Sequence, residues 1–373
     1  MNPTLILSLA VLALPFALTA STNSGDTPHY RSYFYVGGAY TALATNASEL
    51  VHTGQMYVER LTPTSAGRSR APILLLHGNA QTGANFLNTP DGRPGWTSHF
   101  LAAGHTVVLP DQVFRGRSPT PPGYQLASYP AEYIVRQFTS PYGWPQARLH
   151  TQWPGDGVPG DAVFDAYFAS TAPFEGNNTL QQLRMRTALV ELVSAAAAGF
   201  DDDVVVVAHS QAGLFAWALA DEVPAKIKAL VMLEPSGPPF REAVTGRRAA
   251  RRWGLTDIPL RYDPPVVDPE TELKVVEIGR DTPANASCFM QQEGTVRSLE
   301  KLKDVPVLLV TGEASYHAVY DHCTMDFLRQ AGVKVEFMKL WEKGQRGNGH
   351  MFIMEKNSRE VWKLVEDWIT KLK

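Results

Sequence analysis

Short apolar runs recur along the chain and are separated by longer segments with helical spacing. The later runs are almost continuously apolar and β-branched, as strands covered on both faces tend to be. The first two runs predict an antiparallel hairpin. The predicted strands are 31–40, 54–61, 71–78, 105–111, 203–210, 228–235, 305–313 and 333–341.

Helices are predicted between these strands, including 179–199, 211–223 and 357–373. An alternation of strands and helices is typical of a mostly parallel sheet with helices on both faces. We therefore predict an α/β fold with an eight-stranded sheet. The chain of 373 residues can hold one large domain of this kind, which we expect to span 22–373.

Two long segments, 115–178 and 236–300, interrupt the alternation and read as insertions at strand ends. In a compact domain such loops are usually functional, so we expect a lid or cap. A surface decoration without substrate contact is the alternative. Five aromatic residues of the first insertion are expected to lie over the active site: Tyr142, Trp144, Trp153, Phe164 and Tyr167.

The N-terminus predicts export. A largely apolar run from Leu5 to Leu18 precedes small residues within 1–21, and this run is short for a membrane span and contains Pro15. A cleaved signal peptide would leave a secreted protein without stable membrane insertion. Because no Lys or Arg precedes the run, an uncleaved anchor remains the alternative.

Two further features agree with the secretory route. N-x-S/T triplets at Asn46, Asn177 and Asn285 are candidate glycosylation sites. The chain has two cysteines, Cys288 and Cys323, which in an oxidising compartment suggest one disulfide. Two buried free thiols are the alternative.

Composition excludes some partners. The chain is 44% hydrophobic and 19% charged, with a net charge of −3. It therefore has no excess of positive charge of the kind that predicts nucleic-acid binding. No motif predicts a metal site, a cofactor or a phosphate-binding loop. The expected partner is a small molecule.

The first candidate for chemistry is Ser210, at the end of a predicted strand in "VVVVAHSQAGLFAWALA". A serine nucleophile on such a strand-to-helix turn usually has the pattern G-x-S-x-G, but Ala208 and Ala212 stand here. Alanine comes nearest to glycine in size, so the turn is still possible. A tight turn without catalysis is the alternative.

An oxyanion hole is predicted beside Ser210. The run "ILLLHGNAQTG" leaves a strand through a turn of the kind that supplies one backbone N–H. We assign that donor to Asn79, with Ala80 as second choice. The other donor is the residue after the nucleophile, Gln211.

The base should follow the nucleophile in the chain, which leaves His317, His322 and His350. His350 lies in "GQRGNGHMF", a glycine-rich loop just after the last predicted strand. That position favours His350, with His317 as its competitor because it follows the preceding strand.

The acid departs from the common pattern. Many hydrolases of this type have an Asp near the position of Ser315, but none is present here. Glu234 instead ends a buried strand, an arrangement that is costly unless the carboxylate has a partner. An imidazolium is such a partner, so Glu234 is the predicted acid. Glu313 and Asp321 are the rivals.

Several motifs occur together: "YVGGAY", "GQMYVERL", "HGNAQTG", "PDGRPGW", "AHSQAG", "LEPSGP" and "GNGHMFIMEKN". In combination they resemble secreted α/β-hydrolases, specifically bacterial esterases with a Ser-Glu-His triad and their fungal relatives. The bacterial members carry paired cysteines after "HG", beside the oxyanion hole. This chain has Asn79 and Ala80 there, so that disulfide does not carry over.

These inferences predict a serine esterase that cleaves an ester or lactone of a small organic molecule through an acyl-enzyme. Ser210 would attack, His350 would move the proton, and Glu234 would orient the imidazole. Many fungal sequences of this kind lie beside secondary-metabolite genes. A pathway enzyme that uses the serine for cyclisation or condensation, or a non-catalytic binding protein, remains an alternative.

Overall fold

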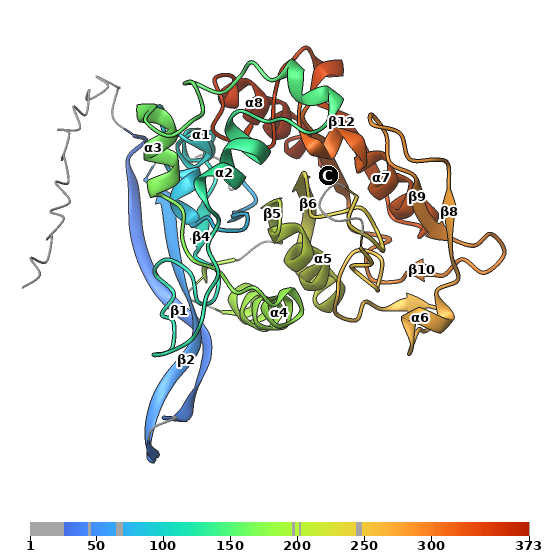
Figure 1. The fold of residues 1–373 in the computed structure, drawn as a ribbon. Helices are drawn as coiled ribbons and strands as arrows, with labels where there is room; N and C mark the ends of the chain where they lie inside the picture. The colour runs from blue at the N-terminus through green and yellow to red at the C-terminus, as the bar shows by residue number, and fades with distance from the viewer. Residues whose placement is uncertain are drawn as a thin grey trace, which may run out of the picture.

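The chain folds around one central sheet (Figure 1). The computed structural model describes residues 26–43, 46–64, 70–195, 198–200, 203–243 and 248–372. The predicted signal peptide, 1–21, lies outside these ranges.

Eight strands form the sheet, in the order β1-β2-β4-β3-β5-β6-β11-β12. β2 pairs antiparallel with both β1 and β4, and every other neighbouring pair is parallel. The eight predicted strands and the mostly parallel sheet are therefore confirmed. Their bounds are β1 His29–Leu43, β2 Asn46–Pro63, β3 Ile73–Leu76, β4 Val107–Pro110, β5 Val204–His209, β6 Ile227–Leu233, β11 Val307–Thr311 and β12 Val335–Lys339.

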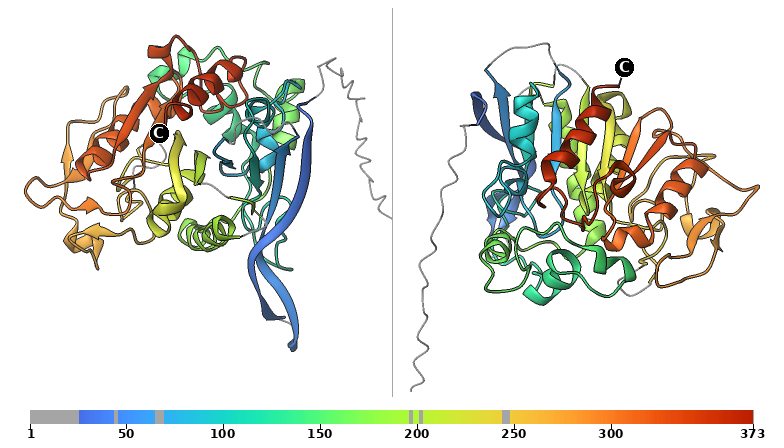
Figure 2. Two further views of the ribbon diagram at one scale, coloured as in Figure 1. Left: turned by 180° about the vertical axis from the view of Figure 1, so that it is seen from behind. Right: turned by 90° about the horizontal axis from the view of Figure 1, so that it is seen from above.

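The predicted hairpin is present and longer than expected. β1 and β2 pair over almost their whole length, with Tyr35 opposite Tyr57. Figures 1 and 2 show its far end reaching beyond the rest of the molecule. β1 forms one edge of the sheet.

Each face of the sheet carries its own apolar core, because consecutive side chains of a strand point to opposite faces. Val204 and Val206 of β5 pack in the core that contains Trp217, whereas Val205 and Val207 pack in the other core. Figures 1 and 2 show α4 and α8 on opposite sides of the sheet.

The three predicted helices are present as α4, α5 and α8. The sequence of α5 is apolar almost all around the helix, and α5 is buried along almost its whole length. The helices are α1 Trp96–Ala102, α2 Ala131–Ile134, α3 Ala162–Ala169, α4 Asn178–Ser194, α5 Ala212–Glu222, α6 Pro269–Glu272, α7 Asp321–Gln330 and α8 Ser358–Ile369. In the described ranges, no helix is long and apolar enough to cross a membrane.

The two predicted insertions have structure of their own. The first, 115–178, contains α2 and α3 and a single π-helical turn, Val135–Thr139. The second, 236–300, contains α6 and two small antiparallel pairs, β7–β10 and β8–β9. Their bounds are β7 Tyr262–Asp263, β8 Val275–Ile278, β9 Cys288–Gln291 and β10 Ser298–Leu299.

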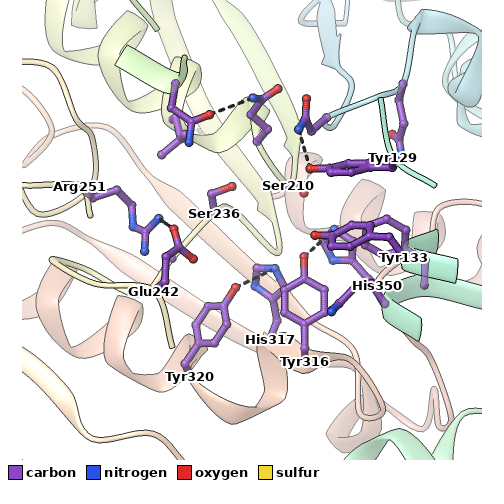
Figure 3. Close-up of a pocket in the computed structure, with 18 of the residues that line it drawn as sticks. Tyr129, Tyr133, Ser210, Ser236, Glu242, Arg251, Tyr316, His317, Tyr320 and His350 are labelled. Carbon is purple, nitrogen blue, oxygen red and sulfur yellow. Dashed lines mark hydrogen bonds and ion pairs between the residues drawn. The ribbon is translucent and has the colours of Figure 1, made fainter. Parts of the chain in front are cut away.

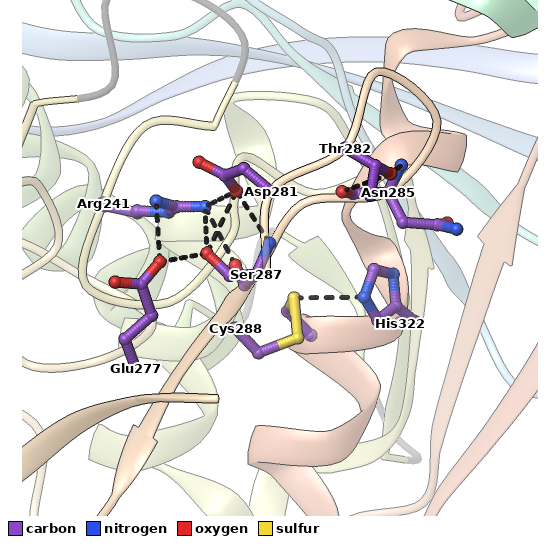
Figure 4. Close-up of a disulfide and its surroundings, with 9 residues drawn as sticks. Arg241, Glu277, Asp281, Thr282, Asn285, Ser287, Cys288 and His322 are labelled. Carbon is purple, nitrogen blue, oxygen red and sulfur yellow. Dashed lines mark hydrogen bonds and ion pairs between the residues drawn. A yellow bond between two sulfur atoms is a disulfide. The ribbon is translucent and has the colours of Figure 1, made fainter. Parts of the chain in front are cut away.

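The predicted disulfide is present. Cys288 on β9 is bonded to Cys323 on α7, across 35 positions of the chain. The bond joins the second insertion to a helix of the main core (Figure 4). The alternative of two free thiols is therefore wrong.

Candidate active site

Ser210 lies on a sharp turn between β5 and α5, at the wall of a cavity (Figure 3). Its φ of 56° is in the left-handed region, which residues with a side chain rarely adopt. The Ser210 N–H donates to the carbonyl of Leu233, and its carbonyl accepts from the N–H of Ser236, both at 3.0 Å. Ala208 and Ala212, at the usual glycine positions, are fully buried and fit the turn.

The chains around this turn pass very close to one another. A Cβ on Gly78 would lie 3.0 Å from Nδ1 of His209 and 3.1 Å from Cβ of Ser210. A Cβ on Gly213, in the first turn of α5, would overlap the ring of Pro235. Glycine at these two positions therefore allows the turn to form.

Glu234 follows β6 directly, and its carboxylate contacts the imidazole of His350. Oε2 of Glu234 lies 2.5 Å from Nδ1 of His350. The carboxylate also accepts hydrogen bonds from the N–H of Gly312 at 2.7 Å and from the hydroxyl of Ser315 at 2.6 Å. The predicted acid and the predicted base are thus neighbours in space, although 116 positions apart in the chain.

Burial shifts the pKa values of both groups. Loss of solvent raises the pKa of Glu234 above its usual range, the charge of Asp321 adds to this, and the bonds from Ser315 and Gly312 oppose it. Loss of solvent lowers the pKa of His350 well below its usual value, and His209 adds to this effect. A lowered pKa keeps the imidazole unprotonated near neutral pH, as a general base requires.

The loop that carries His350 is held by a second buried carboxylate. Glu355 accepts from the N–H of Gly349 at 2.9 Å and from Nδ2 of Asn348 at 2.8 Å. Its other partner is Nε2 of His150, at 2.7 Å, in the first insertion. Glu355 therefore fixes the backbone before His350 and ties it to the insertion.

The free side of His350 faces the cavity. Its Nε2 lies 3.4 Å from the hydroxyl of Tyr316, a long and therefore weak contact. Within the described part of the chain, no hydrogen bond joins Ser210 to His350, although both line the cavity. Catalytic hydrogen bonds are often long before substrate binds.

The candidate oxyanion donors lie on two adjacent turns. Asn79 and Gln211 both line the cavity, whereas Ala80 does not. No acceptor among the described residues takes the backbone N–H of Asn79 or of Gln211. Gln211 immediately precedes α5, where the helix dipole favours negative charge. Both N–H groups are therefore available to a ligand.

Sequence reasoning missed Arg115, which connects these two turns. One of its terminal nitrogens lies 3.2 Å from the carbonyl of Gly78 and 3.5 Å from Oε1 of Gln211, and the other donates to Oδ1 of Asn79 at 3.0 Å. Arg115 is almost wholly buried, and burial lowers its pKa to about 9. An arginine at the start of an insertion is expected to be exposed to solvent. Nothing in the sequence therefore indicated that Arg115 would be buried beside the site.

The cavity has a volume of about 430 Å³, within the roughly 300–1,000 Å³ of small-molecule sites. Both insertions contribute to its wall, the first through Tyr129 and Tyr133, and the second through Ser236, Glu242 and Arg251. Figure 3 shows the Glu242–Arg251 ion pair opposite the tyrosines. The wall thus combines aromatic rings with polar groups.

The aromatic residues expected to cover the site do not line this cavity. Tyr142 is 59% exposed, and Trp153 packs edge-on against Tyr167 inside the insertion. Trp144 donates its indole N–H to the carbonyl of Ala314. Trp144 packs against Tyr316, and Trp153, Phe164 and Tyr167 belong to the apolar core on one face of the sheet, so the buried rings anchor the insertion to the main domain. The aromatic residues at the cavity are Tyr129, Tyr133, Phe138, Tyr316 and Tyr320.

The rival catalytic residues have other partners. Glu313 pairs with Arg346 at 2.8 Å and does not contact His350. His322 lies 3.4 Å from Sγ of Cys323, beside the disulfide (Figure 4). His317 and Asp321 pair with each other, at 3.0 Å.

The three glycosylation candidates, Asn46, Asn177 and Asn285, are all exposed. Two groups in the described chain bring metal-ligating atoms within 4.8 Å of one another. One consists of Glu234, His317 and His350, and the other of the disulfide cysteines with His322. Both are engaged in other bonds, the first in the carboxylate–imidazole contact and the second in the disulfide.

Comparison with known proteins agrees with this architecture. Residues 71–266 match a family model described as alpha/beta hydrolase fold. Over 347 residues, the chain is 40% identical to a protein named probable secreted lipase phiG from Fungal sp. (strain ATCC 74256), covering 91% of this chain and 89% of that protein. A solved bacterial esterase has a TM-score of 0.65 and 24% identity, covering 94% of this chain and 99% of that chain. The likeness to the bacterial esterase concerns the fold alone.

Proposed function

Because the chain belongs to the α/β-hydrolase fold family, we propose that it is a serine hydrolase that cleaves a carboxylic ester or lactone of a small organic molecule. The main observation behind this proposal is the contact of 2.5 Å between Oε2 of Glu234 and Nδ1 of His350. His350 lines the same cavity as Ser210. The similarity of the chain to a protein named as a probable secreted lipase supports the same reaction class.

Ser210 is the proposed nucleophile. In the substrate complex its hydroxyl replaces the weak contact of Tyr316 at Nε2 of His350 and gives its proton to that nitrogen as the oxygen attacks the carbonyl carbon. His350 then donates the proton to the leaving alcohol, which departs and leaves an acyl-enzyme. Water, activated by the same imidazole, hydrolyses this ester and restores the serine.

Negative charge develops on the carbonyl oxygen during attack. The N–H groups of Asn79 and Gln211 are its proposed donors, since both line the cavity and neither has an acceptor in the described chain. Arg115 supports this arrangement, because its guanidinium bonds to both turns and brings a positive charge close to them. Glu234 orients His350 and balances the imidazolium.

The proposed setting is the secretory route. It rests on the signal-like 1–21, on the exposed N-x-S/T asparagines and on the Cys288–Cys323 disulfide. The proposed mature domain is 22–373, with 115–178 and 236–300 as a cap whose residues contribute to the cavity.

Hydrolysis of p-nitrophenyl butyrate tests the proposal. Wild-type protein should release p-nitrophenol, and Ser210→Ala should lose this activity while keeping its circular dichroism spectrum. Ser194→Ala, at an exposed serine on α4, is the matched control and should remain active. Wild-type protein that is inert towards short aryl esters, alkyl esters and lactones would leave cyclisation, condensation or binding as the function.

A further inference from the structure

A second imidazole–carboxylate pair lies beside the proposed triad. Nδ1 of His317 is 3.0 Å from Oδ1 of Asp321, and the other oxygen of Asp321 accepts from the hydroxyl of Thr311 at 2.6 Å. The rings of His317 and His350 are parallel within 2°, with centroids 4.9 Å apart. His317, Asp321 and Thr311 are all buried, and the proposed mechanism uses none of them.

The far side of His317 contacts a tyrosine at the cavity. Nε2 of His317 lies 3.0 Å from the hydroxyl of Tyr320, and both residues line the cavity that holds Ser210. Figure 3 shows this contact beside Tyr316. Asp321, His317 and Tyr320 thus form a chain of hydrogen bonds that leads from the core to the substrate space.

The direction of these hydrogen bonds follows from the carboxylate. A carboxylate only accepts, so Nδ1 of His317 carries the hydrogen that bonds to Asp321. In the neutral imidazole, Nε2 then has only a lone pair, and the Tyr320 hydroxyl must donate to it. The single proton of Tyr320 is therefore directed inward, and its oxygen can only accept from a ligand.

We propose that the Asp321–His317–Tyr320 chain makes the Tyr320 oxygen an obligatory acceptor, so that the enzyme selects esters that carry a hydroxyl group. This inference rests on the proposed function and names the substrate class of the same site. A site built to accept a hydrogen bond disfavours a ligand that lacks the donor, because the buried acceptor oxygen is then left without a hydrogen-bond donor.

The rest of the cavity agrees with a compact, polar ester. Ser236 and Tyr133 each add a hydroxyl group to the wall, and Glu242 adds a carboxylate. The volume of about 430 Å³ suits a small molecule. Tyr320 is therefore the proposed specificity-determining residue.

Two matched substrate series test the inference, one for each side of the ester. The first compares p-nitrophenyl esters of butyrate, 3-hydroxybutyrate and 3-methoxybutyrate. The second compares butyrate esters of propanol, 1,2-propanediol and 2-methoxyethanol. Wild-type enzyme should prefer the hydroxyl-bearing member of at least one series by about tenfold or more in kcat/KM, over both the unsubstituted and the methoxy members.

Tyr320→Phe removes the acceptor oxygen together with its hydrogen bond to His317, and it should reduce this preference to about twofold or less. Tyr142→Phe is the matched control, since Tyr142 is exposed and does not line the cavity, and it should keep the full preference. The methoxy comparison needs no substitution, so it tests the inference even if Tyr320→Phe fails to fold.

Labelling of Ser210 by a fluorophosphonate separates the two possible failures. If wild-type Ser210 is labelled but neither series shows a preference, or if Tyr320→Phe keeps the preference, the inference is wrong and the proposed function stands. If Ser210 is not labelled, the proposed function is wrong and the inference falls with it.

Discussion

Oε2 of Glu234 lies 2.5 Å from Nδ1 of His350, and both side chains are almost completely buried. The glutamate leaves β6 with a φ of 46°, in the left-handed region, so the backbone is strained at the position that supplies the carboxylate. The contact thus joins the end of a strand to a loop late in the chain, and it holds the imidazole in one orientation.

Glu234→Gln should keep the fold and lower kcat strongly. The amide is close to the carboxylate in shape, but it removes the charge partner of the imidazolium and the acceptor that orients the ring. The decrease could approach about 10⁴-fold, as for an acid-to-amide change in a serine protease triad. The measurement is kcat on p-nitrophenyl butyrate.

Glu313→Gln is the matched control for that variant. Glu313 pairs with Arg346 and has no contact with His350, so its loss should change kcat only slightly. If Glu313→Gln lost most of its kcat while Glu234→Gln kept it, Glu234 would not be the acid that orients His350.

Arg115→Met should lower kcat on the same substrate by about tenfold or more, with a smaller change in KM. Arg115 bonds to Gly78 and Asn79, so its removal loosens a donor that acts mainly in the transition state. Arg346→Met, on an exposed side chain, is the control and should be close to wild type. An Arg115→Met enzyme with raised KM and unchanged kcat would show that the guanidinium serves binding instead.

The acid limb of the pH–rate profile should lie below pH 6.5, the ordinary imidazole pKa. Burial lowers the pKa of His350, so the neutral base persists to lower pH, and kcat/KM falls only as pH drops through the lowered value. Because the two groups are in contact, the midpoint of the acid limb is an apparent pKa of the Glu234–His350 pair and not of either residue alone. Measurement of kcat/KM between about pH 4 and 9 checks this, and a midpoint above 6.5 would contradict it.

Removal of the disulfide should destabilise the protein. Cys288→Ser with Cys323→Ser opens a link across 35 positions, for which chain entropy gives an upper estimate of about 4 kcal/mol in the free energy of unfolding. Denaturant unfolding of the oxidised protein and of the double variant measures the difference. Equal stabilities would show that the bond adds nothing to the folded state.

Much of the fold follows from the hydrophobic pattern. The central strands were predictable because runs such as Val204–His209 are buried on both faces, whereas the largely exposed β1 was predicted as half of a hairpin with β2. The helix α7 was missed, because its run from Asp321 to Gln330 carries many polar residues and buries only one side. The first insertion showed large aromatic residues, but a sequence does not tell which rings face a cavity and which pack together.

The catalytic candidates were accessible from the sequence, whereas their supports were not. Ser210 and Glu234 each directly follow a buried strand, and His350 lies in a loop after the last strand, so chain order pointed to them. Arg115 contacts Asn79, 36 positions earlier in the chain, whereas Tyr320 contacts His317, only three positions away. The first contact forms only when the chain folds, and for the second the sequence does not show that both side chains face a cavity.

The site of fluorophosphonate labelling in the wild-type enzyme, mapped by peptide mass spectrometry, tests whether Ser210 is the nucleophile. We expect one adduct per chain, on Ser210, and a greatly slowed reaction in Glu234→Gln, because the nucleophile then lacks a properly oriented base. No adduct, or an adduct on another residue with Ser210 unmodified, would contradict this expectation.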